Sequence, residues 1–93
     1  MRQIVLSTQF KKDLKLARKR NLPEAELLIV VHKLANDEPL EDKYHDHMLI
    51  GKYKGYNECH IQPDWLLVYN KTDRAINVLN LYRTGTHSDL FGK

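Results

Sequence analysis

The sequence predicts an α+β fold in which two helices pack on one face of a curved, mainly antiparallel sheet. Helical periodicity is confined to residues 8–35, and strand-like runs separated by turn residues follow over residues 48–82. A short strand-like run at residues 2–6 precedes both. Helices grouped apart from a four-strand antiparallel meander are typical of α+β architectures. The chain is long enough for one small domain, which we expect to span residues 1–93.

The first strand leads directly into the first helix. Ile4 and Val5 are β-branched, which favours a strand over residues 2–6. Ser7 or Thr8 can cap the helix that follows, because a hydroxyl oxygen accepts a backbone N–H that the first turn leaves free. The apolar residues of this helix recur at helical spacing and are expected to face the core: Phe10, Leu14 and Ala17.

A second helix is predicted from Pro23 to about Ala35. Proline is favourable in a first helical turn, where its missing N–H costs little. The apolar residues cover so much of the circumference that we expect this helix to be well buried. They are Leu27, Leu28, Val30, Val31, Leu34 and Ala35. The polar residues 36–47 then predict a loop that leads into the sheet.

Four strands in series are predicted from the turn residues between them. Lys54-Gly55 suits a tight turn, and so does Pro63-Asp64, because proline presets the backbone and aspartate can bond its own backbone. In the last strand the apolar residues change phase, which indicates a bulge or burial on both faces. The strands are expected at residues 48–53, 56–61, 65–70 and 75–82, and the tail has room for a helical turn.

Strand alternation places His60 on the sheet face away from the helices. Cys59 and Ile61 fit the helix side, so His60 should project from the opposite, open face. The Pro63-Asp64 turn would then hold His60 and Asp64 close together at one end of a hairpin.

A basic segment underlies the net charge of +3. Residues 11–20 contain six basic side chains and one acidic one, so the rest of the chain is slightly acidic. Such a basic ridge predicts contact with nucleic acid or with an acidic protein, although a solvated helix face can have the same composition. The candidate contact residues are Lys11, Lys15, Arg18 and Lys19.

Several features bear on the cellular setting. No segment approaches the ~18 apolar residues of a membrane span, and the N-terminus lacks an apolar stretch of secretory length. Cys59 is the only cysteine, so no internal disulfide can form, which fits a reducing compartment. We therefore expect a cytoplasmic protein with no membrane partner.

The residues argue against nucleophilic protease chemistry and against a metal centre. Cys59 lies mid-strand among apolar residues, and no serine lies in a nucleophile elbow. The histidines and Asp64 are enough ligands for zinc, but they come from separate segments and match no recognised zinc spacing. We expect no metal and no cofactor.

Acid–base catalysis at a phosphodiester accounts for more of these residues. Histidine exchanges protons near neutral pH, and Arg83 could hold a phosphate by a two-pronged contact. Trp65, Tyr69 and Phe91 could stack on the bases of single-stranded RNA. Taken singly, each type has a structural alternative: a surface histidine, a core tryptophan, or an arginine paired with a carboxylate. Their joint placement near strand ends favours catalysis.

Three stretches carry long motifs with consistent spacing. They are residues 47–56 (HMLIGKYKGY), 59–69 (CHIQPDWLLVY) and 83–92 (RTGTHSDLFG). Together they resemble the YafQ branch of the RelE/ParE toxin superfamily, and the similarity spans nearly the whole chain. The resemblance implies a RelE-like fold and a bacterial type II toxin. Such a toxin is an mRNA endoribonuclease that cuts codons in the ribosomal A site without a metal, and a co-encoded antitoxin protein neutralises it.

Through this resemblance, the groups of the reaction can be assigned residue by residue. His87 would be the general acid for the leaving 5′-oxygen. His60 or Asp64 would help to activate the attacking ribose 2′-hydroxyl. Arg83, with His47, would stabilise the phosphorane.

The resemblance also assigns the substrate contacts. Trp65 and Phe91 would position the nucleotide, and the basic ridge would contact ribosomal RNA or an acidic antitoxin. Asn57 and Gln62 differ from the arginine and glutamate more usual in the branch, which bears on substrate fit or antitoxin contacts. Two other classes stay open: a ParE-type toxin that inhibits gyrase and needs no acid–base groups, and a non-catalytic RNA-binding regulator of translation.

Overall fold

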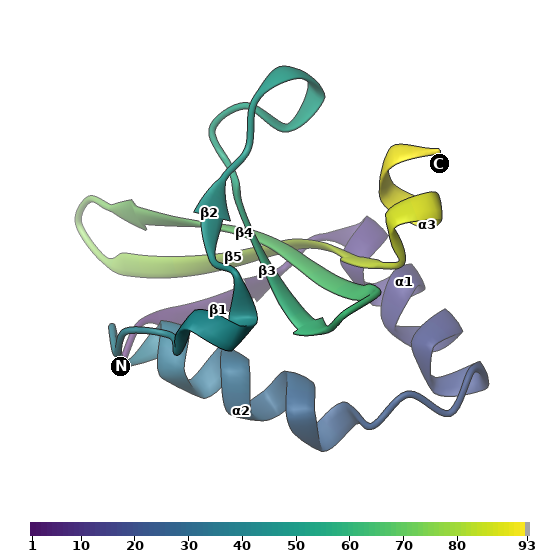
Figure 1. The fold of residues 1–93 in the computed structure, drawn as a ribbon. Helices are drawn as coiled ribbons and strands as arrows, with labels where there is room; N and C mark the ends of the chain where they lie inside the picture. The colour runs from purple at the N-terminus through teal and green to yellow at the C-terminus, as the bar shows by residue number, and fades with distance from the viewer. Residues whose placement is uncertain (93) are drawn as a thin grey trace.

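The structure, a computed structural model, describes residues 1–92. Five strands form one sheet in the order β1-β5-β4-β3-β2 (Figure 1). The strands are β1 (Gln3–Leu6), β2 (His47–Met48), β3 (Asn57–Gln62), β4 (Trp65–Asp73) and β5 (Asn77–Gly85). The helices are α1 (Thr8–Lys19), α2 (Glu24–Ala35) and α3 (His87–Phe91), and two 3₁₀ turns are η1 (Asp42–Tyr44) and η2 (Gly51–Tyr53). The predicted α+β fold is confirmed.

The sheet is mixed because its first strand runs parallel to its last. β1 pairs in parallel with β5, with Ile4 opposite Leu79, and all the other pairings are antiparallel. Between β4 and β5 the register shifts after Val68, which leaves Tyr82 as the extra residue. The last strand therefore contains a β-bulge, but it lies at Tyr82, whereas the apolar phase changes between Val78 and Leu79, where the pairing with β4 is regular.

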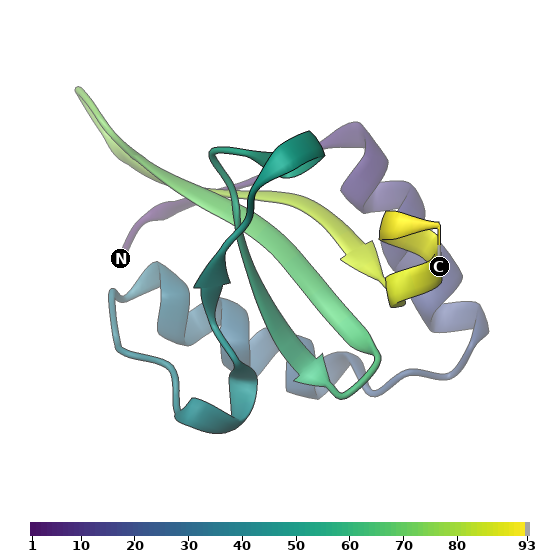
Figure 2. The same ribbon diagram turned by 45° about the horizontal axis from the view of Figure 1, so that its top comes forward.

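Helices α1 and α2 lie on the same side of the sheet (Figures 1 and 2). Ser7 caps α1, because its Oγ accepts the backbone N–H of Phe10 at 2.9 Å. Phe10 and Ala17 of α1 are buried in the main core, and Leu14 packs against it, as predicted. Cys59 and Ile61 face the same core from β3, which confirms the predicted sidedness of that strand.

Helix α2 is less buried than the sequence predicted. Leu27, Val30 and Leu34 are buried, but Leu28 is 53% exposed and the neighbouring Ile29 is 52% exposed. The prediction that Leu28 is buried is therefore wrong. In a two-layer fold the outer side of a helix packs against no third layer, so apolar residues there remain in contact with solvent.

The prediction of a strand at residues 48–53 is also wrong. β2 ends at Met48, and the chain then turns through η2, where Gly51 has a φ of +71° that favours glycine. The η2 turn inserts Tyr53 into a second core on the sheet face opposite α1 and α2. Buried Leu66, Val68 and Leu90 complete this core, so the face expected to be open is partly covered by η2 and α3.

Candidate active site

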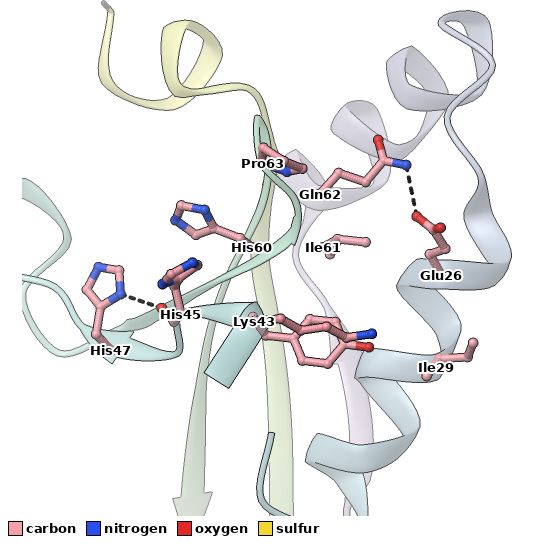
Figure 3. A pocket seen from close by; sticks show the side chains of 10 residues that line it. Glu26, Ile29, Lys43, His45, His47, His60, Ile61, Gln62 and Pro63 are labelled. Carbon is pink, nitrogen blue, oxygen red and sulfur yellow. Dashed lines mark hydrogen bonds between the residues drawn. The ribbon is translucent and has the colours of Figure 1, made fainter. Parts of the chain in front are cut away.

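Four histidine side chains gather at one edge of the sheet. The ring centroid of His60 lies 5.3 Å from that of His45, 6.4 Å from that of His47 and 5.5 Å from that of His87. His60 comes from β3, while His45 and His47 come from the loop and strand beside it (Figure 3). The fourth, His87, is the first residue of α3. Residues far apart in the sequence thus form one cluster around His60.

His87 is fixed by Asp64. Its Nδ1 donates a hydrogen bond to Asp64 Oδ1 at 2.7 Å, and its backbone N–H donates to the same oxygen at 2.9 Å. These hydrogen bonds, first from the backbone and then from the ring, lower the pKa of Asp64 below its usual range. A capping box between Thr86 and Asp89 fixes the start of α3. His87 Nε2 has no hydrogen-bond partner within residues 1–92, so it can face a substrate.

Glu58 is a site residue that the sequence analysis did not identify. It is only 4% exposed, and its Oε1 lies 3.2 Å from His60 Nε2 and 3.6 Å from His47 Nε2. A buried carboxylate needs such partners, and it orients both rings. The available signal was its position on the same strand face, two residues before His60.

His47 is held from both ends of its ring. Its Nδ1 donates to the backbone carbonyl of His45 at 2.6 Å (Figure 3). Its Nε2 lies 3.6 Å from Glu58 Oε1. His45 has a φ of 49°, in the left-handed region that non-glycine residues rarely adopt. The structure therefore brings together four of the predicted site residues: His47, His60, Asp64 and His87.

Arg83 of β5 forms an ion pair with Asp13 of α1. Its Nη2 and Nε lie 3.0 Å and 3.1 Å from the two carboxylate oxygens of Asp13. This two-pronged contact is the main cause of the raised pKa of Arg83. The backbone N–H of Thr84 also donates to Asp13, whose side chain is buried. The phosphate contact of Arg83 stays a prediction, and it would use guanidinium N–H groups other than the Nε and Nη2 donors that bind Asp13.

The three aromatic residues predicted to stack on RNA bases differ. Tyr69 is 3% exposed and its hydroxyl donates to Asp46 at 2.6 Å, so its ring does not offer a stacking face. Trp65 is 1% exposed within the main core, so it cannot stack on a base in this structure. This prediction is corrected, since the first residue of β4 points toward the helices. Phe91 is 37% exposed, and its ring centroid lies 6.5 Å from that of His87. It remains suitably placed for a nucleotide contact.

The basic ridge on α1 is partly neutralised. Arg18 pairs with Glu24 at 2.8 Å, and Arg20 pairs with Asp89 of α3 at 2.7 Å. Four exposed lysines of the ridge form no ion pair within residues 1–92. They are Lys11, Lys12, Lys15 and Lys19.

The Cys59 thiol, metal-ligand groups and membrane-spanning helices were each considered in the sequence. Cys59 is fully buried, and burial raises the pKa of its thiol, so it offers no nucleophile. Within residues 1–92, no three histidine, cysteine, aspartate or glutamate side chains are grouped so that they could hold a metal ion. The same part of the chain contains no helix long and apolar enough to cross a membrane.

Comparison with known families decides the lineage of the chain. Residues 2–92 match the family described as the bacterial toxin of a type II toxin-antitoxin system, YafQ. The chain belongs to the YafQ toxin family. It is 45% identical over 92 residues to the mRNA interferase toxin YafQ of Escherichia coli strain K12, covering 98% of this chain and 97% of that one.

Solved YafQ structures share the fold over the full length. The crystal structure of YafQ from E. coli strain BL21(DE3) matches with a TM-score of 0.90 at 43% identity, covering 99% of this chain and 100% of that one. YafQ in the crystal structure of the E. coli DinJ-YafQ toxin-antitoxin complex matches with a TM-score of 0.87 at 44% identity, covering 98% of both chains.

Proposed function

We propose that this chain is an mRNA interferase, a toxin that cleaves mRNA by acid–base catalysis through attack of a ribose 2′-hydroxyl. The observation that carries the proposal is the pairing of His60 with His87, whose ring centroids lie 5.5 Å apart. Each imidazole has its own carboxylate, Glu58 for His60 and Asp64 for His87. Two proton carriers with separate partners suit a reaction that removes one proton and delivers another.

His87 acts as the general acid in this mechanism. Asp64 accepts a hydrogen bond from the Nδ1–H of His87, so Nε2 of the imidazolium is the nitrogen that faces the leaving 5′-oxygen. The ionised Asp64 stabilises the positive ring before it gives up its proton. Because both hydrogen bonds to Asp64 come from His87, that carboxylate is less suited to serve as the base.

His60 acts as the general base. It takes the proton of the 2′-hydroxyl, whose oxygen attacks phosphorus while the bond to the 5′-oxygen breaks, leaving a 2′,3′-cyclic phosphate. Glu58 is a positioning residue that holds the His60 ring. His47, beside the same carboxylate, supplies positive charge to the phosphorane, and Phe91 positions the nucleotide.

The proposed partners are the ribosome, its mRNA and a co-encoded antitoxin, in the cytoplasm. The unpaired lysines of α1 give the molecule a cationic surface suited to ribosomal RNA. Relatives named mRNA interferase toxins favour this function over gyrase inhibition of the ParE type. A toxin-antitoxin complex is known for the E. coli protein, which makes an antitoxin the expected protein partner.

Induction of variants in cells tests the proposal. We expect the wild type to cut a reporter mRNA within codons, as mapped by primer extension, and His87→Ala to lose ~10²–10⁴-fold of that activity. His32→Ala is the matched control, because His32 is exposed on α2 and does not belong to the histidine cluster. Equal cleavage by wild type and His87→Ala would refute the assigned general acid, and absence of cleavage by the wild type would refute the nuclease.

A further inference from the structure

A cavity of about 810 Å³ adjoins the histidine cluster on the side of α2. It exists because β2 pairs only with Asn57 and Glu58, so among residues 1–92 no strand lies beside the rest of β3 at that edge. The η1 turn and α2 form the opposite wall (Figure 3). A cavity of this size, open to solvent and next to reacting groups, is typical of a ligand site.

The lining of this cavity is apolar on its walls and polar at one end. Ile29, Tyr44, Ile61 and Pro63 provide apolar surface that suits the flat faces of a nucleobase. Lys43 adds a cation at the rim of the cavity, where a phosphate of the bound RNA could pass. These features together fit a nucleotide better than a wholly apolar or wholly charged ligand.

The position of the cavity beside the histidine cluster decides which of the two nucleotides flanking the cleaved bond it can bind. His60 lines the cavity and His87 does not. The attacking and leaving oxygens of a phosphoryl transfer lie roughly in line on opposite sides of phosphorus. With His60 as base and His87 as acid, the ribose that supplies the 2′-hydroxyl lies on the cavity side.

We infer that this cavity binds the base of the nucleotide on the 5′ side of the cleaved bond, and that Glu26 and Gln62 select amino-bearing bases over uracil there. The inference rests on the proposed function and adds a specificity site to it. Gln62 Nε2 donates to Glu26 Oε2 at 2.9 Å, which fixes the amide (Figure 3). The other Glu26 oxygen and the Gln62 carbonyl oxygen have no partner within residues 1–92 and accept hydrogen bonds.

Hydrogen-bond complementarity gives the direction of this selection. Adenine, cytosine and guanine each carry an exocyclic amino group, which donates to such acceptors. Uracil presents carbonyl oxygens at the corresponding positions, and these would face the Glu26 carboxylate. Contacts to base edges discriminate between bases, and Glu26 is exposed, so we expect about five- to tenfold selection against uracil.

Cleavage-site mapping in cells tests the selection. We expect uracil to be depleted about five- to tenfold immediately 5′ to wild-type cuts, and the depletion to weaken at least twofold in Glu26→Gln and Gln62→Leu. Glu24→Gln is the matched control, because Glu24 precedes Glu26 by two residues but pairs with Arg18 away from the cavity. Uracil frequencies that are the same in Glu26→Gln, Gln62→Leu and wild type would overturn the selection.

A binding measurement separates this inference from the proposed function, because it needs no cleavage. In NMR titrations of the wild type, adenosine 3′-monophosphate should shift the backbone amides of Ile29, Ile61 and Gln62. Uridine 3′-monophosphate should bind about fivefold more weakly. Shifts confined to other residues, or equal affinity for the two nucleotides, would overturn the inference whether or not the chain cleaves mRNA.

Discussion

Arg83 and Asp13 form a two-pronged ion pair, with N–O distances of 3.0 Å and 3.1 Å, that joins the end of β5 to the middle of α1. Asp13 is 8% exposed and accepts a third hydrogen bond from the backbone N–H of Thr84. The pair therefore closes one end of the helix–sheet interface. Its loss should affect stability before it affects chemistry.

Asp13→Ala should lower the free energy of unfolding by about 2–4 kcal/mol, because it leaves Arg83 and the Thr84 N–H without their partner. Urea denaturation at neutral pH measures the change. Glu24→Ala removes the exposed ion pair with Arg18 and should cost less than about 1 kcal/mol. Similar losses in the two variants would show that the Arg83 pair is no stronger than a surface one.

The same pair shows what sequence patterns can and cannot predict here. Periodicity, capping and turn residues predicted the helices and the β3–β4 hairpin, because these depend on local chemistry. The motif resemblance assigned Asp64 and His87 to one site. The partner of Arg83 depends on which residue 70 positions away folds against it, which periodicity does not specify. Burial of Trp65 and exposure of Leu28 likewise depend on how the layers pack.

The wrong strand at residues 48–53 and the missed site residue Glu58 have a common physical cause. Residues 49–53 have the composition of a strand, yet Gly51 turns the chain and Tyr53 fills a core that η2 forms with β4 and α3. Glu58 is a charged residue of the kind that usually faces solvent on a strand, yet its neighbours His47 and His60 cover it. In both cases a tertiary contact overrides the local preference.

The ion pair between Arg20 and Asp89 should make stability depend on acid pH. Hydrogen bonds from Arg20, at 2.7 Å and 3.3 Å, are the main cause that lowers the pKa of Asp89 from 3.8 to about 2. A depressed carboxyl pKa stabilises the fold above the unfolded value, and this contribution is lost as the pH falls from about 4 to about 2. Asp89→Asn should therefore be less stable than wild type at pH 6, with the difference narrowing below pH 4.

Urea denaturation at pH 6, 4, 3 and 2 measures this difference. Asp42→Asn serves as the control, since the Asp42 side chain is exposed and forms no hydrogen bond within residues 1–92. Its stability should run parallel to that of the wild type at every pH. A deficit of Asp89→Asn that is independent of pH would mean that the capping box, and not the charge, provides the stabilisation.

Reversing the unpaired lysines of α1 should weaken ribosome association. The triple variant Lys11→Glu, Lys15→Glu, Lys19→Glu removes exposed cations that have no ion-pair partner within residues 1–92. Co-sedimentation over a salt series should show weaker binding and a smaller dependence on salt, by roughly one unit of slope for each lost phosphate contact. Arg74→Glu, in the exposed β4–β5 turn, is the control. Unchanged binding of the triple variant would leave the ridge as solvated surface.

Replacing the buried Glu58 should slow cleavage without weakening substrate binding. Glu58→Gln keeps the volume but removes the carboxylate that lies 3.2 Å from His60 Nε2, so the His60 ring loses the contact that orients it. We expect single-turnover cleavage on programmed ribosomes to fall by roughly tenfold or more, with ribosome affinity unchanged. Glu41→Gln, which alters only an exposed pair with Lys33, should cleave like the wild type. Loss of affinity with a normal cleavage rate would make Glu58 a binding residue, because a residue that positions the base acts on the chemical step alone.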